Sequence, residues 1–255
     1  MFSVSLSSFS DLIGSTVRAG ESRPFNSSIM PDIVNYHKLL EKRAEVWRGA
    51  GLTPSVLLHS CCAPCSSTCL EVLTRFCRVT VFYFNPNITS KSEYEYRLSE
   101  QKRLISEMPF EHPVGLIEGR YEPEEFLEMS KGLETAPERG PRCVKCYTLR
   151  LRETVLTAKE HGFDYFATTL TLSPLKPAPV INEIGLSLGA ENSVETEFGI
   201  FVPKGAAYLP TDFKKNEGYK RSIELSKEYG LYRQNFCGCD FSKPKEETAR
   251  NNSEV

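Results

Sequence analysis

Short apolar segments alternate along the chain with longer stretches in which apolar residues recur at helical spacing. The apolar segments cover residues 55–59, 79–84 and 165–170. Runs of about four to eight largely apolar residues are typical of strands that are buried on both faces, as in a parallel sheet. These three segments are therefore predicted to be buried strands.

Helices are predicted between and after these strands. Apolar positions at helical spacing indicate helices at residues 69–76, 92–108, 123–129, 143–161, 181–188 and 219–229. Ser92 with Glu95 resembles a capping box that opens the second of these helices. Gly162 and Gly230 follow two of the others and are expected to end them.

This succession of strands and helices predicts an α/β protein whose parallel sheet carries helices on both faces. No internal repeat or long linker interrupts residues 30–241, so they are expected to form a single domain. Sheets of this kind bind ligands beyond the carboxyl ends of their strands. A cysteine-rich loop follows Leu58 at such an end.

The two ends of the chain carry no pattern that would form a core. Residues 1–29 are rich in serine, precede a second methionine at Met30, and are interpreted as a disordered leader or a misassigned start. Residues 242–255 are expected to form a disordered tail. The sequence shows neither a secretory signal nor the roughly 18 to 20 apolar residues of a transmembrane helix. A cytoplasmic protein without a membrane partner is therefore expected.

The composition does not indicate a substrate, but the cysteines indicate the kind of chemistry. The chain has 255 residues, enough to bury a core without a metal, and its formal net charge of -2 gives no overall electrostatic argument for a nucleic-acid partner. In a cytosolic chain, its nine cysteines fit metal ligands or redox thiols better than a disulfide framework.

The first cysteine group is Cys61, Cys62 and Cys65, which lies between a predicted strand and the next helix. A helix start offers free N–H groups and the positive end of the helix dipole, and both favour thiolates. The group is therefore a candidate for metal binding or nucleophilic sulfur. Cys69 and Cys77 have no such setting, and they are expected to be small buried hydrophobic residues.

Two further pairs occur later in the chain. Cys143 and Cys146 lie in the first turn of a predicted helix, a spacing used for zinc, for iron–sulfur clusters and for dithiol chemistry alike. The neighbouring basic residues Arg142, Lys145, Arg150 and Arg152 would favour anionic sulfur, although a solvated helix face accounts for most of them equally well. Cys237 and Cys239 are separated by one glycine, so they can bind a metal or form a labile disulfide.

Other classes of site are not indicated. The sequence has neither a Gly-x4-Gly-Lys-Ser/Thr phosphate loop nor a Gly-x-Gly-x2-Gly dinucleotide motif after a strand. His59 precedes the first cysteine group, but a single histidine at a strand end is more often a structural residue than a catalytic one.

Several motifs in a fixed order resemble the QueH family of epoxyqueuosine reductases over about residues 31–240. They are residues 57–65 (Leu-Leu-His-Ser-Cys-Cys-Ala-Pro-Cys), 84–88 (Phe-Asn-Pro-Asn-Ile), Cys143 with Cys146, 168–170 through the Ser-Pro-Leu-Lys of 173–176, 212–215 (Asp-Phe-Lys-Lys), and 232–234 (Tyr-Arg-Gln) through Cys239. The resemblance implies a Rossmann-like (HUP-like) α/β fold. It also implies the last step of queuosine synthesis, in which the epoxide of epoxyqueuosine at the tRNA wobble position is reduced to an alkene.

The resemblance further implies a set of metal sites. A [4Fe-4S] cluster would be held by Cys61, Cys62, Cys143 and Cys146. An additional mononuclear iron would lie beside it, and Cys237 and Cys239 would contact this iron or cycle between dithiol and disulfide. Cys65 and Asp212 remain open as ligands of that iron.

The same resemblance also implies a partner and further candidate site residues. The expected partner is tRNA bearing epoxyqueuosine, the electron donor is left open, and a monomer is expected. Asp212, Lys214 and Tyr232 are candidate proton donors or tRNA contacts. A basic face for phosphates and a solvated helix face are equally open interpretations of Lys214, Lys215, Lys220, Arg221, Lys227 and Arg233.

Two hypotheses from other classes compete with the reductase. One is a zinc-stabilised RNA-binding module without catalysis, and the other is a thioredoxin-like, metal-free dithiol oxidoreductase. Both leave sulfur unexplained, because the chain has two cysteine pairs in addition to the adjacent Cys61 and Cys62.

Overall fold

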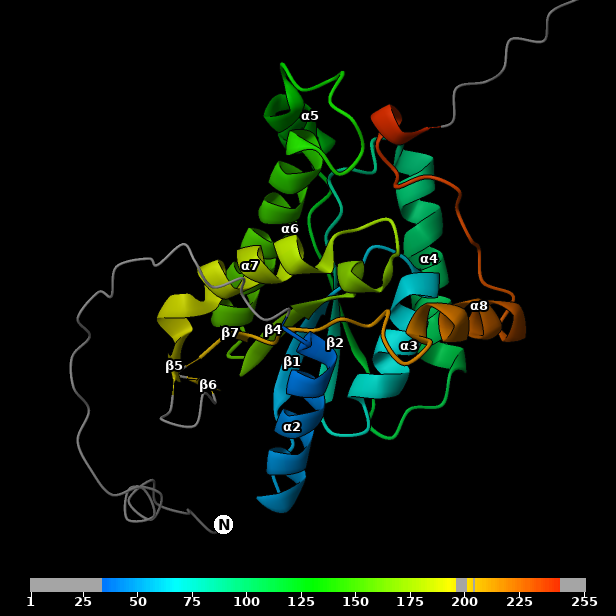
Figure 1. The fold of residues 1–255 in the computed structure, drawn as a ribbon. Helices are drawn as coiled ribbons and strands as arrows, with labels where there is room; N and C mark the ends of the chain where they lie inside the picture. The colour runs from blue at the N-terminus through cyan, green and yellow to red at the C-terminus, as the bar shows by residue number, and fades with distance from the viewer. Residues whose placement is uncertain (1–33, 196–200, 204, 244–255) are drawn as a thin grey trace, which may run out of the picture. The chain divides into compact units, whose positions relative to one another are not determined.

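The computed structural model describes residues 34–195, 201–203 and 205–243, and within them five strands form a central sheet (Figure 1). The strand order is β3-β2-β1-β4-β7, and every neighbouring pair is parallel. The strands are β1 (Ser55–His59), β2 (Arg78–Tyr83), β3 (Gly115–Glu118), β4 (Tyr165–Thr168) and β7 (Ala207–Tyr208). The predicted parallel sheet is confirmed.

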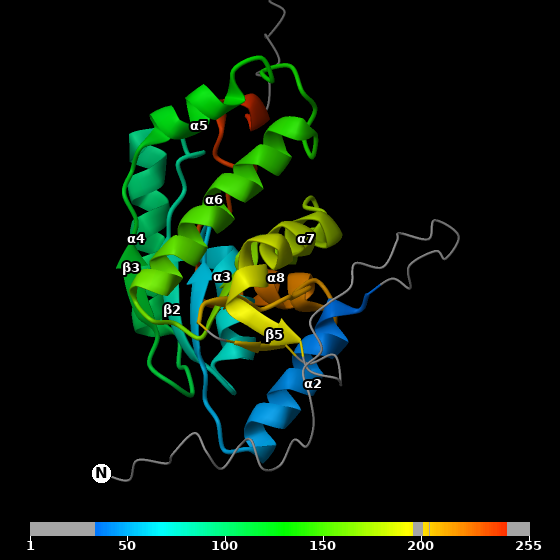
Figure 2. The same ribbon diagram turned by 90° about the vertical axis from the view of Figure 1, so that its left-hand side faces the viewer.

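Helices cover both faces of the sheet (Figure 2). One face carries α2 (Tyr36–Gly49), α3 (Ala63–Leu73), α4 (Lys91–Glu107) and α8 (Gly218–Glu228). The other face carries α6 (Pro141–Glu160) and α7 (Ala178–Gly189), and α5 (Pro123–Ser130) packs on α6. The α/β class and the Rossmann-like arrangement are therefore confirmed.

The alternation of side chains along the strands builds the two halves of the core. Val56 and Leu58 of β1 lie in one buried cluster, and Leu57 between them lies in the other. Successive strand residues point to opposite faces of a sheet. An apolar strand of this kind therefore needs helices on both sides, which explains why the segment has no polar face.

Smaller elements complete the described chain. A separate antiparallel pair consists of β5 (Ser193–Glu195) and β6 (Phe201–Pro203), and three short 3-10 helices are η1 (Thr169–Leu172), η2 (Ala190–Asn192) and η3 (Asp240–Ser242). No helix in the described ranges is both long and apolar enough to cross a membrane.

Two local predictions were wrong. The segment predicted as a strand over 165–170 leaves the sheet after Thr168, because the Thr168 hydroxyl accepts a hydrogen bond from the Leu170 N–H and starts η1. The capping box at Ser92 does not form. The helix begins one residue earlier, with Ser90 as its N-cap, and the Ser90 and Ser92 hydroxyls bond to each other at 3.0 Å.

Among the α-helices and the strands of the central sheet, three elements were not predicted. The helix α2 has a clear signal, since Leu40, Ala44 and Trp47 are buried at helical spacing. The strands β3 and β7 have little signal, because β3 is only partly buried and β7 has two residues.

The described residues from Asn35 onward belong to one compact unit. The predicted leader, residues 1–29, and most of the predicted tail lie outside the described residues, so the boundaries at 30 and 241 stay predictions.

Candidate functional site

The first cysteine group lies where the order of the strands reverses. From β1 the chain passes outward to β2 and β3 and then returns to β4 on the other side of β1. A crevice at such a switch point, beyond the carboxyl ends of the strands, is the usual ligand site of this architecture. Cys61 follows β1 and Thr169 follows β4, and the Cys61 Sγ and Thr169 Oγ1 atoms are 3.8 Å apart.

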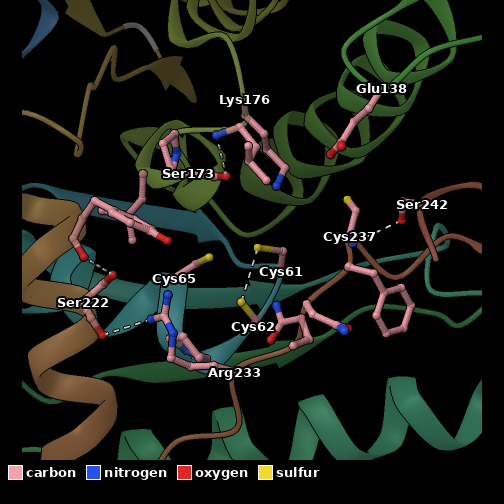
Figure 3. A pocket seen from close by; sticks show the side chains of 18 residues that line it. Cys61, Cys62, Cys65, Glu138, Ser173, Lys176, Ser222, Arg233, Cys237 and Ser242 are labelled. Carbon is pink, nitrogen blue, oxygen red and sulfur yellow. Dashed lines mark hydrogen bonds between the residues drawn. The ribbon is translucent and has the colours of Figure 1, made fainter. Parts of the chain in front are cut away.

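The three sulfur atoms of this group converge. Cys62 is the N-cap of α3, and the Sγ atoms of Cys61 and Cys62 are 3.7 Å apart. The Sγ atoms of Cys61, Cys62 and Cys65 all lie within 4.8 Å of one another, close enough to share a metal ion. Figure 3 shows the three side chains turned toward one another, with Cys237 and Lys176 on the same cavity.

The thiols of this group differ in how readily they lose a proton. Hydrogen bonds from the Cys62 and Cys65 thiols lower the pKa of Cys61, and the positive charges of Lys176 and Arg150 act in the same direction. Hydrogen bonding to Cys61 raises the pKa of Cys62 to about 12. Cys61 is therefore the thiol that most readily becomes the anionic ligand.

Buried polar residues hold the loop that carries these cysteines. The Ser60 and Ser66 hydroxyls both donate to the Gln101 Oε1 atom at 2.8 Å, and the Asn85 amide donates to the Ser60 carbonyl at 2.8 Å. Since these hydrogen bonds are buried, they give the loop a defined backbone path.

His59 is a structural residue of the sheet. Its ring nitrogens lie 3.0 Å from the Thr168 Oγ1 atom and 3.1 Å from the Phe84 carbonyl oxygen, which joins β1 to β4 and to the end of β2. Burial lowers the pKa of His59 to about 3, and Arg150 acts in the same direction. The ring is therefore neutral, which supports the structural interpretation.

The second and third cysteine groups meet in a smaller adjoining cavity. Cys143, Cys146, Cys237 and Cys239 all line it. Cys146 and Cys239 are buried together against Phe126. Residues more than ninety positions apart are thus brought to one place, since Cys146 lies on α6 and Cys239 follows α8.

Cys237 and Lys176 line both cavities, so the three cysteine groups surround one composite site. Cys61, Cys62 and Cys65 form the one set of three or more potential metal ligands that lies within 4.8 Å among the described residues. Cys143 and Cys146 do not belong to that set. All nine cysteines carry free thiols, and Cys69 and Cys77 lie in the core as predicted.

The arm with Cys237 and Cys239 is held from several sides. Gly238 has a φ of +112°, a conformation that favours glycine, and a Cβ added there would lie 2.8 Å from the Ile88 Cγ1 atom. The Arg97 guanidinium donates to the Cys237 carbonyl at 3.3 Å. The Ser242 hydroxyl accepts from the Cys237 N–H at 3.2 Å and from the Cys239 thiol at 3.3 Å.

Asp212 and Lys214 lie behind the cavity wall. The two side chains form an ion pair at 3.2 Å, and Asp212 lines neither cysteine cavity. The Lys214 amine donates to the Thr171 carbonyl at 3.0 Å and reaches the Lys176 carbonyl at 3.5 Å. The pair therefore supports the loop that carries Lys176.

Tyr232 and the candidate basic face are also largely paired. The Tyr232 hydroxyl donates to Glu93. Arg221 pairs with Glu71 at 2.7 Å, and Lys220 pairs with Glu217 at 3.1 Å. This favours a solvated helix face over a uniformly basic surface at α8.

The sequence left open whether the basic residues on α6 stabilise anionic sulfur or form a solvated helix face. Arg142 and Arg150 are buried and line the second cavity, whereas Lys145 and Arg152 are exposed, so the solvated face describes the second pair alone. Lys176 appeared only within a motif, yet it lines both cavities. Burial lowers the pKa of Lys176, but negative charge at Cys237 and Cys61 outweighs this effect and raises it.

Comparisons with known proteins agree with this geometry. A family model described as "Epoxyqueuosine reductase QueH" matches residues 56–245. The protein of that name from Staphylococcus epidermidis is 42% identical over 219 residues, which cover 84% of this chain and 86% of the relative. The one from Streptococcus pyogenes is 41% identical over 211 residues, covering 82% and 78%. The one from Thermotoga maritima is 32% identical over 194 residues, covering 74% and 90%. The chain therefore belongs to the QueH family of epoxyqueuosine reductases.

Proposed function

We propose that this chain reduces the epoxide of epoxyqueuosine in tRNA to the alkene of queuosine. Membership of a family of oxidoreductases supports the reaction class. The observation that carries the chemistry is the convergence of the Cys61, Cys62 and Cys65 sulfur atoms within 4.8 Å, beside a cavity that Cys237 also lines.

The residues present fit an iron–sulfur cluster, since cysteine thiolates are the usual ligands of such clusters. We propose Cys61, Cys62, Cys143 and Cys146 as the ligands of a [4Fe-4S] cluster, because they line two adjoining cavities. When bound, the cluster would supply electrons one at a time.

A second, mononuclear iron is proposed beside Cys237 and Cys239. Cys65 is better placed than Asp212 as a further ligand, because Cys65 lines the first cavity and Asp212 lines neither. Asp212 keeps a place in the proposal as a residue that acts on the cavity through Lys214.

Cys237 and Cys239 either bind this iron or cycle between dithiol and disulfide, and in the second case they would account for the stoichiometry. Conversion of an epoxide to an alkene and water consumes two electrons and two protons. Two thiols that close to a disulfide release two electrons and two protons, so the reaction balances without another co-reactant in that turnover. An external reductant then restores the dithiol.

The first cavity would receive the reacting ring. It has a volume of about 170 Å³, and its walls include the Ser173–Lys176 loop and the Arg233–Cys237 arm. Lys176 and Arg233 bring positive charge to the walls, which suits a nucleotide substrate.

Anaerobically reconstituted protein, a chemical reductant and epoxyqueuosine-containing tRNA would test the proposal, with nucleoside analysis of the product. Wild-type protein is expected to form queuosine, and the Cys143→Ser variant to form at least tenfold less. Equal conversion by the two proteins would contradict the cluster ligands, and colourless, fully active protein would contradict the cluster itself.

The two competing hypotheses make different predictions. A zinc-stabilised RNA-binding module without catalysis is disfavoured by membership of a reductase family. A metal-free dithiol oxidoreductase would keep its activity after complete chelation, whereas the proposed enzyme loses it.

A further inference from the structure

Arg150 is a buried cation whose terminal nitrogen atoms have no hydrogen-bond partner among the described residues, and its guanidinium lies 5.9 Å from the centre of the Tyr147 ring. Its side chain is 0% exposed and lines the second cavity. Its Nε atom donates to the Cys146 carbonyl at 3.4 Å, but both terminal nitrogens are buried without a hydrogen bond among the described residues. The guanidinium thus has several N–H donors directed at no protein acceptor.

Such an arrangement is costly unless an anion completes it. Burying an unpaired charge lowers the free energy of unfolding by several kcal/mol, and each unsatisfied donor lowers it further. The one acidic residue that lines the same cavity is Glu138, which is exposed, and the Arg150 terminal nitrogens make no hydrogen bond to it among the described residues. The missing partner is therefore not a carboxylate of the described chain.

The surroundings of Arg150 indicate the chemistry of that anion. Arg150 lines the second cavity together with Cys143, Cys146, Cys237 and Cys239. The thiols of two of the three cysteine groups thus share this cavity with the guanidinium. A metal–thiolate cluster held by these groups carries net negative charge, and more of it when reduced.

We propose that Arg150 is the counter-cation of the bound iron–sulfur cluster and donates its N–H groups to the cluster's sulfur atoms. This inference rests on the proposed function. Hydrogen bonds and positive charge stabilise the reduced, more negative state of a cluster, so Arg150 raises the reduction potential. It acts as a positioning and tuning residue and does not contact the substrate.

Arg142 offers a matched control on the same helix. It is also buried, but its Nη1 atom donates to three carbonyl oxygens, those of Leu133, Glu134 and Ala136, at 2.8 to 2.9 Å. The Arg142 Nη1 atom therefore has its partners within the protein, although the Arg142 Nε atom is also buried without one among the described residues. The two arginines differ in whether the end of the guanidinium is hydrogen-bonded to the described protein.

The first test compares full-length proteins after the iron has been removed by chelation. Arg150→Met is expected to unfold at the same temperature as wild type or at a higher one, because the substitution removes an unpaired buried charge. Arg142→Met is expected to unfold at a clearly lower temperature. If Arg150→Met lost as much stability as Arg142→Met, Arg150 would have a partner in the unloaded protein, a water network included, and the inference would fail.

The second test measures the midpoint potential of the cluster in reconstituted protein by redox titration with electron paramagnetic resonance. Loss of the hydrogen bonds is expected to lower the equilibrium constant for reduction about tenfold in Arg150→Met, or about 59 mV for one electron. Arg150→Lys, which keeps the charge, is expected to recover part of the shift. A structural role alone would leave the potential unchanged.

The outcomes separate the two proposals. Wild-type protein that assembles no cluster would overturn the proposed function and, with it, the role of Arg150. Loaded wild-type and Arg150→Met proteins with equal potentials would overturn the role of Arg150 alone.

Discussion

The cysteines of this protein fall into two classes according to what surrounds their sulfur atoms. Cys62 lies at the start of α3 and lines the first cavity, whereas Cys77 is 0% exposed in the apolar core and its thiol has no hydrogen bond among the described contacts. Sulfur that lines a cavity beside other thiols can bind a metal, whereas sulfur enclosed in an apolar core stays a neutral thiol.

This difference predicts separate effects of the same substitution. Cys62→Ser is expected to lose most of the bound iron with little change in the stability of the unloaded protein. Cys77→Ser is expected to keep its iron but to lose about 1–3 kcal/mol of stability, because the new hydroxyl is buried without a partner. Iron assays and denaturant unfolding measure the two effects. Loss of iron in Cys77→Ser that exceeds its loss of folded protein would refute the division.

Gly238 predicts a second effect at the scale of one residue. Alanine at this position combines a left-handed backbone with a Cβ only 2.8 Å from Ile88, so Gly238→Ala is expected to displace the arm and reduce turnover at least tenfold. Gly132→Ala is the control, since Gly132 also has a positive φ, +75°, but nothing lies within 4 Å of the added atom. Gly132→Ala should cost about 1–2 kcal/mol of stability and leave turnover intact. Equal turnover in the two variants would argue against a steric requirement at Gly238.

Among the elements, α4 contacts the arm that carries Cys237 and Cys239. Arg97 is 1% exposed, its Nε atom is fixed by Glu93 at 2.6 Å, and its guanidinium lies 5.0 Å over the Phe236 ring. It also donates to the Phe236 and Cys237 carbonyls. One helix thus holds both the backbone and a side chain of the segment that leads into Cys237.

These contacts of Arg97 predict that the Arg97→Gln substitution makes the arm that carries Cys237 more mobile. The Cys237 thiol should then react several times faster with a bulky thiol reagent, because the backbone that positions it has lost a buried clamp. Lys102→Gln on the same helix is the control, since the Lys102 pair with Glu118 is about half exposed and remote from the arm. Such surface pairs contribute about 0–1 kcal/mol. An unchanged rate of thiol modification in Arg97→Gln would show that other contacts fix the arm.

For the whole molecule, the site joins segments that are far apart in the chain. The β1–α3 loop, the start of α6 and the arm after α8 each contribute cysteines to the adjoining cavities. A ligand that binds all three therefore binds the folded state in preference to the unfolded chain.

Loading with iron and sulfide is therefore expected to raise the unfolding temperature. Binding at about 1,000 times the dissociation constant contributes roughly 4 kcal/mol, and about 2–4 °C accompany each kcal/mol in a protein of this size, so the rise is on the order of 10 °C. Anaerobic thermal unfolding with and without chelation measures it, and Cys143→Ser should show a smaller rise. An unfolding temperature that is independent of loading would mean that the three segments do not share a ligand.

The sequence alone determined the local elements and the chemical types of the site residues. Strands β1 and β2 and helix α6 could be predicted because their periodicity depends on residues only a few positions apart. The three cysteine groups, the place of the first one at the end of β1, and the family resemblance were equally readable. The partly buried edge strand β3 and the two-residue strand β7 were not, because an edge or very short strand carries little apolar signal.

Only the tertiary structure decided which of these residues meet. Cys146 and Cys239 are brought together by the packing of helices on the sheet, and no local pattern encodes that packing. The same packing buries the terminal nitrogens of Arg150 without an acceptor among the described residues and leaves Arg152, two residues later, in solvent. Burial depends on the free energy of the whole folded core, so the environment of a charge is a property of the assembled fold and not of its neighbours in the chain.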